Sequence, residues 1–343
     1  MKKIKLFLVK WYLKTGLFFY YRSIKVHGLK NIPKDTPAMV LGNHQNALID
    51  ALLIAVNLPQ FGYYLTRASV FKKPKIASLL KGLNMIPVFR IRDGWQKIER
   101  NKSIFHHCIE LLNENNIVVI FPEGSHNLVR RVRPLSKGFT RIVFDFLEEY
   151  PEQELQLIPV GFNFRNATEF VDEVTMYVDK PHPISHDPNS LRHDQVVNLK
   201  SEIHQALSQL TTQIPEENYD STLNRLNELN VNFLDPKTVN QCISSQFDSC
   251  KPQKKSALKP LRSLLKFLLK IAMIIPYAIW KTYVQPKIVE KEFMATFRFV
   301  VVITVVPVYL ILLGLAIGFL IGWEAAAIAI GSIIILSILT VKI

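Results

Sequence analysis

Two polar residues, His44 and Asp50, follow an apolar run at 38–41 that has the length of a buried strand. A histidine in such a turn is largely neutral near neutral pH and can accept a proton, because its unperturbed pKa is about 6.5. A carboxylate on the other ring nitrogen fixes the tautomer and stabilises the imidazolium that forms. His44 and Asp50 are therefore candidates for a general base and its orienting group.

Two further segments end in residues suited to a binding site. The run 85–90 ends in Arg90, whose guanidinium can bind a phosphate through two parallel hydrogen bonds, which lysine cannot reproduce. The run 157–161 carries Pro159 near its end. We expect both to line the crevice that holds His44.

A fourth segment, 117–126, is an apolar run that stops at a proline and leads into a turn. The glycine of this turn lets the backbone approach a ligand closely, and exposed amides there can hold an anion. A basic stretch follows and provides a positive field for a phosphate. The candidate binding residues here are Glu123, Gly124, Ser125, Arg130 and Lys137, and the stretch also contains Arg131 and Arg133.

These four segments belong to a pattern in which apolar strands alternate with helical stretches between residues 24 and 179. Strands are predicted at 24–27, 38–41, 63–66, 85–89, 117–121, 157–164 and 175–178, and helices at 46–56, 98–113 and 137–147. Such alternation predicts a three-layer α/β fold with a mainly parallel sheet. In that fold ligands bind outside the carboxyl ends of the strands, where all four polar segments lie.

The composition favours a membrane partner. Lys and Arg exceed Asp and Glu by 14, and 49% of the 343 residues are hydrophobic, with much of this fraction in two C-terminal runs. The uncharged stretch 299–323 is long enough to span a bilayer, and 325–341 is at the short end of that range. We therefore expect a C-terminal α-helical transmembrane hairpin, and no nucleic-acid-binding module appears. Basic residues flank both ends of the hairpin, which predicts that the α/β domain lies on the cytoplasmic face.

The cysteines and the remaining histidines do not indicate further chemistry. Cys108, Cys242 and Cys250 do not make a disulfide framework, which favours a reducing compartment. His182 and His186 lie among prolines without further ligands, so we expect no metal site.

The ordered motifs resemble those of the glycerolipid acyltransferase family, which acylates glycerol 3-phosphate and lysophosphatidate. The resemblance covers roughly residues 24–180 and rests on Asn43-His44 with Asp50, Ile86-Pro-Val-Phe-Arg90, Phe121-Pro-Glu-Gly124 and Ile158-Pro-Val160. It implies that His44 deprotonates the acceptor hydroxyl and that Asp50 orients His44. It also implies that Arg90, Glu123 and Gly124 position the glycerol-phosphate end, and that Pro159 belongs to the acyl-donor side.

The resemblance implies a membrane-bound enzyme that takes its acyl group from acyl-CoA or acyl carrier protein and needs no metal or redox cofactor. The expected organisation is an amphipathic membrane-surface helix (1–23), an acyltransferase domain (24–233), a basic linker (234–260), an interfacial amphipathic segment (261–298) and the transmembrane hairpin (299–343). The other partner is membrane phospholipid. The expected role is acylation of glycerol 3-phosphate or lysophosphatidic acid in phospholipid biosynthesis.

One departure from the family pattern concerns the catalytic pair. Five residues separate His44 from Asp50, where four are usual, and on a continuous helix one extra residue turns the carboxylate by about 100°. We expect the turn around Gln45 and Asn46 to absorb it; the longer spacing also resembles a branch of fungal-type glycerol-3-phosphate acyltransferases. Two alternatives stay open: acylation of another lysolipid, such as a lyso-aminolipid or a different lysophospholipid, and a non-catalytic lipid-binding homologue.

Overall fold

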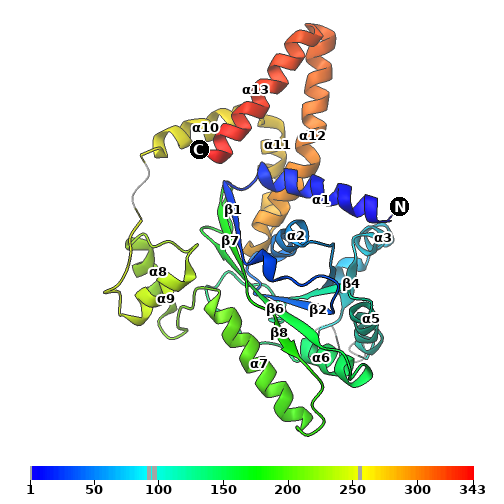
Figure 1. Cartoon of the computed structure of the whole chain (residues 1–343). Helices are drawn as coiled ribbons and strands as arrows, with labels where there is room; N and C mark the ends of the chain where they lie inside the picture. The colour runs from blue at the N-terminus through cyan, green and yellow to red at the C-terminus, as the bar shows by residue number, and fades with distance from the viewer. Residues whose placement is uncertain (1, 91–93, 95–98, 254–256) are drawn as a thin grey trace.

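A mixed eight-stranded sheet forms the centre of the molecule (Figure 1). The computed structural model describes residues 2–90, 94, 99–253 and 257–343. The strands are β1 (Ser23–His27), β2 (Ala38–Gly42), β3 (Tyr63–Arg67), β4 (Met85–Val88), β5 (Ile117–Ile120), β6 (Leu155–Phe164), β7 (Glu173–Val178) and β8 (His182–Ile184).

The order of the strands confirms the predicted α/β fold with a mainly parallel sheet. It runs β1-β7-β6-β2-β5-β3-β4, and β8 pairs with β6. All neighbours from β6 to β4 are parallel, whereas β7 and β8 run antiparallel to β6. The carboxyl ends of β2, β3, β4, β5 and β6 therefore share one edge of the sheet.

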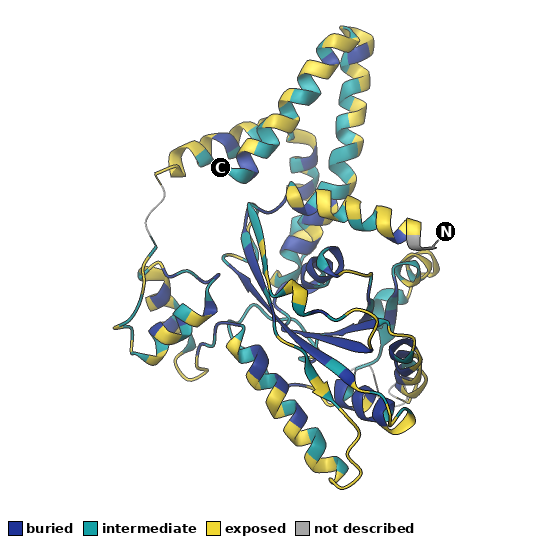
Figure 2. Cartoon of the chain, viewed as in Figure 1, coloured by how far each residue is buried: buried dark blue, intermediate teal, exposed yellow. Residues whose placement is uncertain are grey.

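The sheet lies between two helical layers because successive side chains of its central strands point to opposite faces. Ala38 and Val40 of β2 pack with one helical layer, and Met39 and Leu41 pack with the other. The first layer consists of α1 (Lys2–Phe18) and α2 (Ala47–Asn57), joined by the start of α12 (Met294–Leu320). The second consists of α5 (Asn101–Asn113), α6 (Gly138–Glu149) and α7 (Arg192–Gln209). Figure 2 shows the sheet buried between them.

A small helical unit follows the sheet and corrects two expectations. The segment 234–260 was expected to be a linker, but it contains α9 (Pro236–Ser244), which packs with α8 (Tyr219–Glu228) around Leu226 and Val239. Cys242 and Cys250 form a disulfide, although the sequence suggested no pairing. Gln246 and Phe247 both have positive φ and reverse the chain between the two cysteines, a turn that the sequence did not reveal. The basic residues at 254–256 lie outside the described part of the chain.

The C-terminal part contains the two expected long apolar helices. They are α12 and α13 (Trp323–Lys342), and both are long and apolar enough to cross a membrane. The helix α12 begins at Met294, five residues earlier than the uncharged run, because the intervening charged residue Arg298 packs over Trp280 instead of ending the helix. Before it, α10 (Lys259–Ala272) and α11 (Ile274–Ala278) are separated by a sharp bend, with an angle of 96° between the helical stretches on either side.

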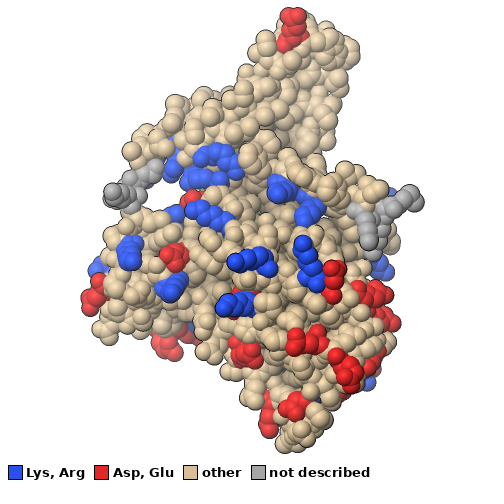
Figure 3. All heavy atoms as spheres, viewed as in Figure 1, with Lys and Arg blue, Asp and Glu red and all other residues tan. Residues whose placement is uncertain are grey.

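Two amphipathic helices lie at the base of this hairpin. α1 exposes Phe7, Leu8 and Trp11, and α10 exposes Leu264 and Phe267. Figure 3 shows few charges on the hairpin, while Lys and Arg gather just below its base and acidic residues dominate the opposite end of the molecule. Apolar helices beside a cationic band are typical of a surface that rests on lipid headgroups.

Candidate active site

The centre of the site is the pair formed by His44 and Asp50 beyond the carboxyl end of β2. His44 Nδ1 lies 2.9 Å from Asp50 Oδ2, which leaves Nε2 available to accept a proton. Asp50 is fully buried, and its Oδ2 also accepts a hydrogen bond of 2.8 Å from the backbone N–H of Asn46. Burial raises the pKa of Asp50, while the hydrogen bond with His44 opposes this shift by favouring the carboxylate.

The turn between β2 and α2 accommodates the longer spacing of the pair. Ala47, the first residue of α2, has a φ of 42°, in the left-handed region that residues with a Cβ rarely adopt. The side chain of Asn46 is held by a hydrogen bond of 3.0 Å to the Ala167 carbonyl. The extra residue is thus absorbed before the regular helix begins, and Asp50 reaches His44 from the first turn of α2.

An aromatic ring fixes the orientation of the imidazole. Phe121, which directly follows β5, stacks on His44 with 4.2 Å between ring centroids and 17° between ring planes. A Cβ on Gly42 would lie 2.9 Å from this ring, so only glycine leaves room for it at the end of β2. Asn43 ties the same turn to β6, because its Oδ1 accepts from the Phe162 amide at 2.7 Å.

The turn after β5 is organised around a buried ion pair. Glu123 accepts the backbone N–H of His44 at 3.0 Å and the Nε–H of Arg133 at 2.6 Å. Arg133 also donates to the Ser125 hydroxyl at 2.8 Å. Burial raises the pKa of Glu123, and Arg133 partly counters this. Glu123 and Ser125 therefore hold the loop against the catalytic turn, and Gly124 between them has a φ of 71° that favours glycine.

Three of the expected binding residues take positions that do not serve the pair of His44 and Asp50. The Arg130 guanidinium donates to the carbonyls of Phe164 and Arg165 at 2.9 and 2.8 Å and packs 3.8 Å from the centroid of the Phe233 ring. It supports the end of β6, and burial lowers its pKa to about 10. Lys137 is exposed at the start of α6, and Pro159 is buried within β6, in register with Leu41.

Two arginines lie at the ends of neighbouring parallel strands on the edge that holds His44. Arg67 ends β3 in register with Val88 of β4, and Arg90 follows two residues later. The side chain of Asn101 fixes this strand end by bonding both the amide and the carbonyl of Phe89, at 3.0 and 2.7 Å. Arg67 was not expected from the sequence, and it joins Arg90 as a candidate for anion binding.

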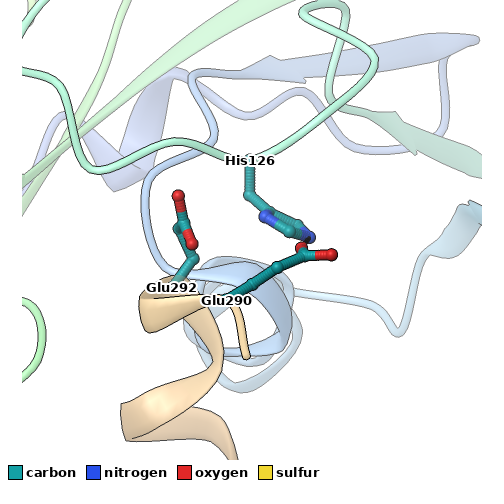
Figure 4. A group of neighbouring side chains, drawn as sticks. All are labelled: His126, Glu290 and Glu292. Carbon is teal, nitrogen blue, oxygen red and sulfur yellow. Dashed lines mark ion pairs between the residues drawn. The ribbon is translucent and has the colours of Figure 1, made fainter. Parts of the chain in front are cut away.

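The chain that leads into the membrane hairpin closes one side of the site (Figure 4). His126 Nε2 lies 3.5 Å from Glu290 Oε2, and its ring meets the Phe293 ring edge-on at 4.6 Å. The same imidazole lies 5.6 Å from that of His44, and Arg67 packs over Phe293 at 5.8 Å. Phe293 directly precedes α12, so the catalytic turn lies close to the point where the chain enters the hairpin.

His126, Glu290 and Glu292 are also the described group whose spacing could hold a metal ion, with ligand atoms within 4.8 Å of one another. Both carboxylates lie on the short segment before α12, and Glu290 is exposed. Burial lowers the pKa of His126 to about 4, so this histidine is neutral at physiological pH. The group therefore presents an acidic wall beside the catalytic base.

The sequence analysis missed several of these residues for a common reason. Arg133 was visible only as one of several basic residues, and nothing distinguished it from Arg130. Glu290 and Phe293 lie far along the chain from the motifs, in a segment expected to be interfacial. Their contact with His126 is a tertiary fact without a local sequence signal.

Part of this chain is similar in sequence to known acyltransferases. A family model described as acyltransferase matches residues 23–163. A chloroplastic 1-acyl-sn-glycerol-3-phosphate acyltransferase of Brassica napus is 26% identical over 138 residues, 40% of this chain and 38% of that protein. A Bacillus subtilis 1-acyl-sn-glycerol-3-phosphate acyltransferase is 30% identical over 121 residues, 35% of this chain and 56% of that protein.

A crystal structure of the 1-acyl-sn-glycerophosphate acyltransferase PlsC of Thermotoga maritima aligns with a TM-score of 0.42 at 21% identity, covering 60% of this chain and 80% of that one. The match to the Brassica napus protein spans about two fifths of the length of that protein. The helical unit after β8 and the hairpin lie beyond the residues that the family model matches. Residues 23–163, which contain the catalytic turn and the loop after β5, are the part of the chain that matches the acyltransferase family model.

Proposed function

We propose that this protein transfers a fatty acyl group from acyl-CoA or acyl carrier protein to a hydroxyl of glycerol 3-phosphate or lysophosphatidic acid, at the cytoplasmic face of the membrane. The observation that carries the proposal is the contact of 2.9 Å between His44 and the buried Asp50 at the carboxyl end of β2. It supplies a base with a fixed tautomer at the carboxyl edge of the sheet, 5.6 Å from His126, whose ring contacts Phe293 at the start of the membrane hairpin.

In the proposed reaction, His44 Nε2 takes the proton of the acceptor hydroxyl while the hydroxyl oxygen attacks the thioester carbonyl. Asp50 stabilises the imidazolium that forms, as a carboxylate does in other histidine-based sites. The tetrahedral intermediate collapses with cleavage of the carbon–sulfur bond, and the leaving thiolate takes the proton from His44. The base is regenerated, and no metal or redox step is needed.

The acceptor phosphate has two candidate partners, Arg67 and Arg90, at the ends of β3 and β4. Guanidinium groups at adjacent strand ends can bind the oxygens of one phosphate. Arg133 is less suited to this role because Glu123 and Ser125 already occupy its donors. In this proposal Arg133 acts on the geometry of the loop and not directly on the substrate.

One observation favours a second candidate function. The carboxylates of Glu290 and Glu292 lie beside His126, next to the catalytic base, where they would repel a phosphate and attract an amine. An acceptor with a cationic headgroup, such as a lyso-aminolipid, would suit this wall. The non-catalytic alternative is less favoured, because the pair is assembled despite its longer spacing.

The deciding experiment measures acyl transfer from radiolabelled acyl-CoA by the purified full chain in lipid nanodiscs. Glycerol 3-phosphate, 1-acylglycerol 3-phosphate and a lyso-aminolipid are offered separately. Faster turnover of either phosphate acceptor supports the proposal, and Arg67→Gln then raises its KM. Turnover of the amine acceptor alone supports the second candidate. No turnover of any acceptor by folded protein, with either acyl-CoA or acyl carrier protein as donor, contradicts both.

A further inference from the structure

A group of cations gathers where the C-terminal helices meet the start of β1. Arg22 precedes β1, Arg262 and Lys266 lie on α10, and Lys342 ends α13. Lys342 Nζ donates to the carbonyls of Tyr21 and Arg22 at 2.8 and 3.3 Å. We call these four residues the cationic seam; Figure 3 shows that Lys and Arg gather below the hairpin.

The packing of α10 brings its cations to this seam. Leu265 is the buried side chain of α10, and its carbonyl accepts from the Thr340 hydroxyl of α13 at 3.3 Å. Arg262 and Lys266 therefore lie close enough to Arg22 for their positive charges to repel its charge. The opposite face of α10 exposes Leu264 and Phe267, as expected for a helix that lies on lipid.

The seam has more positive charge than nearby carboxylates neutralise. Among the described residues none of its four members forms an ion pair with an Asp or Glu side chain, although Arg262 Nε lies 2.7 Å from the main-chain oxygen of Ile343. The carboxylates around it are Glu173, Asp172 and the exposed Glu169. Glu173 pairs with Arg165 at 2.6 Å, and Asp172 accepts the Asn166 amide at 2.8 Å.

One donor of the seam also lacks an acceptor among the described residues. Arg22 Nε is removed from solvent and has no hydrogen-bond partner in that part of the chain. Burial lowers the pKa of Arg22, and the neighbouring charge of Arg262 lowers it further. Arg262 Nε is occupied by the Ile343 carbonyl at 2.7 Å, which leaves the other nitrogens of its guanidinium for a ligand. An unpartnered buried donor within a cluster of like charges is what an anion would stabilise.

We propose that the cationic seam binds the phosphate of an anionic membrane phospholipid, as a site separate from the catalytic pair. Phosphate oxygens would accept from Arg22, Arg262 and Lys266, and an acyl chain would lie along the exposed apolar face of α10. The level suits a headgroup, because α10 packs on the C-terminal end of α13, where this apolar helix ends (Figure 1). In the sheet, β7 and β6 separate β1 from β2 and its catalytic turn.

The seam then acts as a clamp between two parts of the molecule. The cations that would contact the phosphate come from the start of β1 and from α10, so one bound phosphate would hold α10 against β1, beside the existing contacts of Lys342 of α13 with Tyr21 and Arg22. This role does not depend on which acceptor the catalytic site uses. Binding and catalysis are therefore measured separately.

The test is native mass spectrometry of the full chain in detergent, titrated with phosphatidylglycerol, phosphatidylcholine or inorganic phosphate. The variant is Arg22→Gln/Lys266→Gln. The matched control is Lys5→Gln/Lys14→Gln, which removes two cations from the exposed side of α1. A cation that contacts the bound phosphate directly should contribute at least about fivefold, so the seam variant should bind phosphatidylglycerol about 25-fold more weakly, whereas Lys5 and Lys14 are not part of the seam and do not contact its phosphate. Wild type and control should bind it equally and prefer it over phosphatidylcholine.

Three results would overturn the proposal. They are equal loss in the seam variant and the α1 control, unchanged phosphatidylglycerol binding in the seam variant, and saturation by inorganic phosphate that displaces the lipid, which would indicate a free-phosphate site. If the double variant does not fold, the single variant Lys266→Gln is used, with Lys14→Gln as its control. A loss below about twofold there also contradicts the proposal.

Discussion

Replacing Asp50 by asparagine removes the charge of the catalytic pair and keeps the shape of the buried side chain. Asp50 Oδ2 accepts from the Asn46 amide at 2.8 Å and lies 2.9 Å from His44 Nδ1. The amide oxygen of asparagine can accept both hydrogen bonds. What the variant lacks is the negative charge that stabilises an imidazolium.

The size of the effect follows from that charge. Two unit charges about 4 Å apart attract by about 4 kcal/mol at an effective dielectric constant of about 20. The imidazolium exists only after His44 has taken the proton, so this stabilisation belongs to the transition state. With about 1.4 kcal/mol per tenfold change in rate, kcat should fall about 10³-fold. KM for both substrates should stay nearly unchanged, because neither substrate binds Asp50.

The stability of the variant should not follow its activity. Burial raises the pKa of Asp50 above its unfolded value, so the charged carboxylate costs stability at neutral pH. This cost disappears as the pH falls through the raised pKa, and asparagine removes it at every pH. Asp50→Asn should therefore melt at or above the temperature of the wild type near neutral pH.

The assay combines steady-state acyl transfer with thermal unfolding of the full chain in the same nanodiscs. Asp194→Asn, at an exposed site in the first turn of α7, is the control for loss of a carboxylate. A kcat within threefold of wild type would refute the role of Asp50. A fall in activity that is matched by a large fall in melting temperature would show a structural role instead.

Arg130→Gln should lower the free energy of unfolding by about 3 kcal/mol, because two carbonyls lose a charged donor. The variant should leave KM for the acceptor unchanged. A raised KM without destabilisation would show that Arg130 binds the acceptor. Phe293→Ala should reduce kcat/KM about fivefold, because the contacts of its ring with His126 and Arg67 are lost. Among the ring contacts described, the Phe297 ring meets only that of Phe293, so Phe297→Ala should have a smaller effect. Equal effects of the two variants would contradict this. His126 has a pKa lowered to about 4, so the wild type should lose stability as the pH falls from about 6.5 to 4, and His126→Gln should lose less; parallel melting curves would contradict the burial of a neutral imidazole.

The sequence predicted the elements whose signal is local. The apolar runs at β2, β5 and β6 are buried on both faces, as parallel strands usually are, and their turns carry the polar residues that were expected there. The prediction that the turn before α2 absorbs the extra residue agrees with the positive φ of Ala47. The two long apolar helices were visible because nothing else in the chain runs so far without a charge.

The remaining features depend on contacts between distant parts of the chain. Arg130 and Arg133 look alike in sequence, yet one supports two carbonyls of β6 and the following turn while the other pairs with Glu123. The contact of Glu290 with His126 joins residues 164 positions apart, and the sequence holds no signal for it. The sequence did not predict helix α9, because the stretch is short and polar like a linker. Its few apolar residues are explained only by their packing on α8.

The most direct test compares two histidines whose rings lie 5.6 Å apart, His44 and His126. Each is replaced by alanine in the full chain, and the rate of acyl transfer is measured at saturating acceptor and donor. His44→Ala should lose at least about 10³-fold in kcat, because the base is gone, whereas His126→Ala should stay within about tenfold of wild type. Retained turnover in His44→Ala, or an equal loss in both variants, would contradict the assignment of His44 as the base.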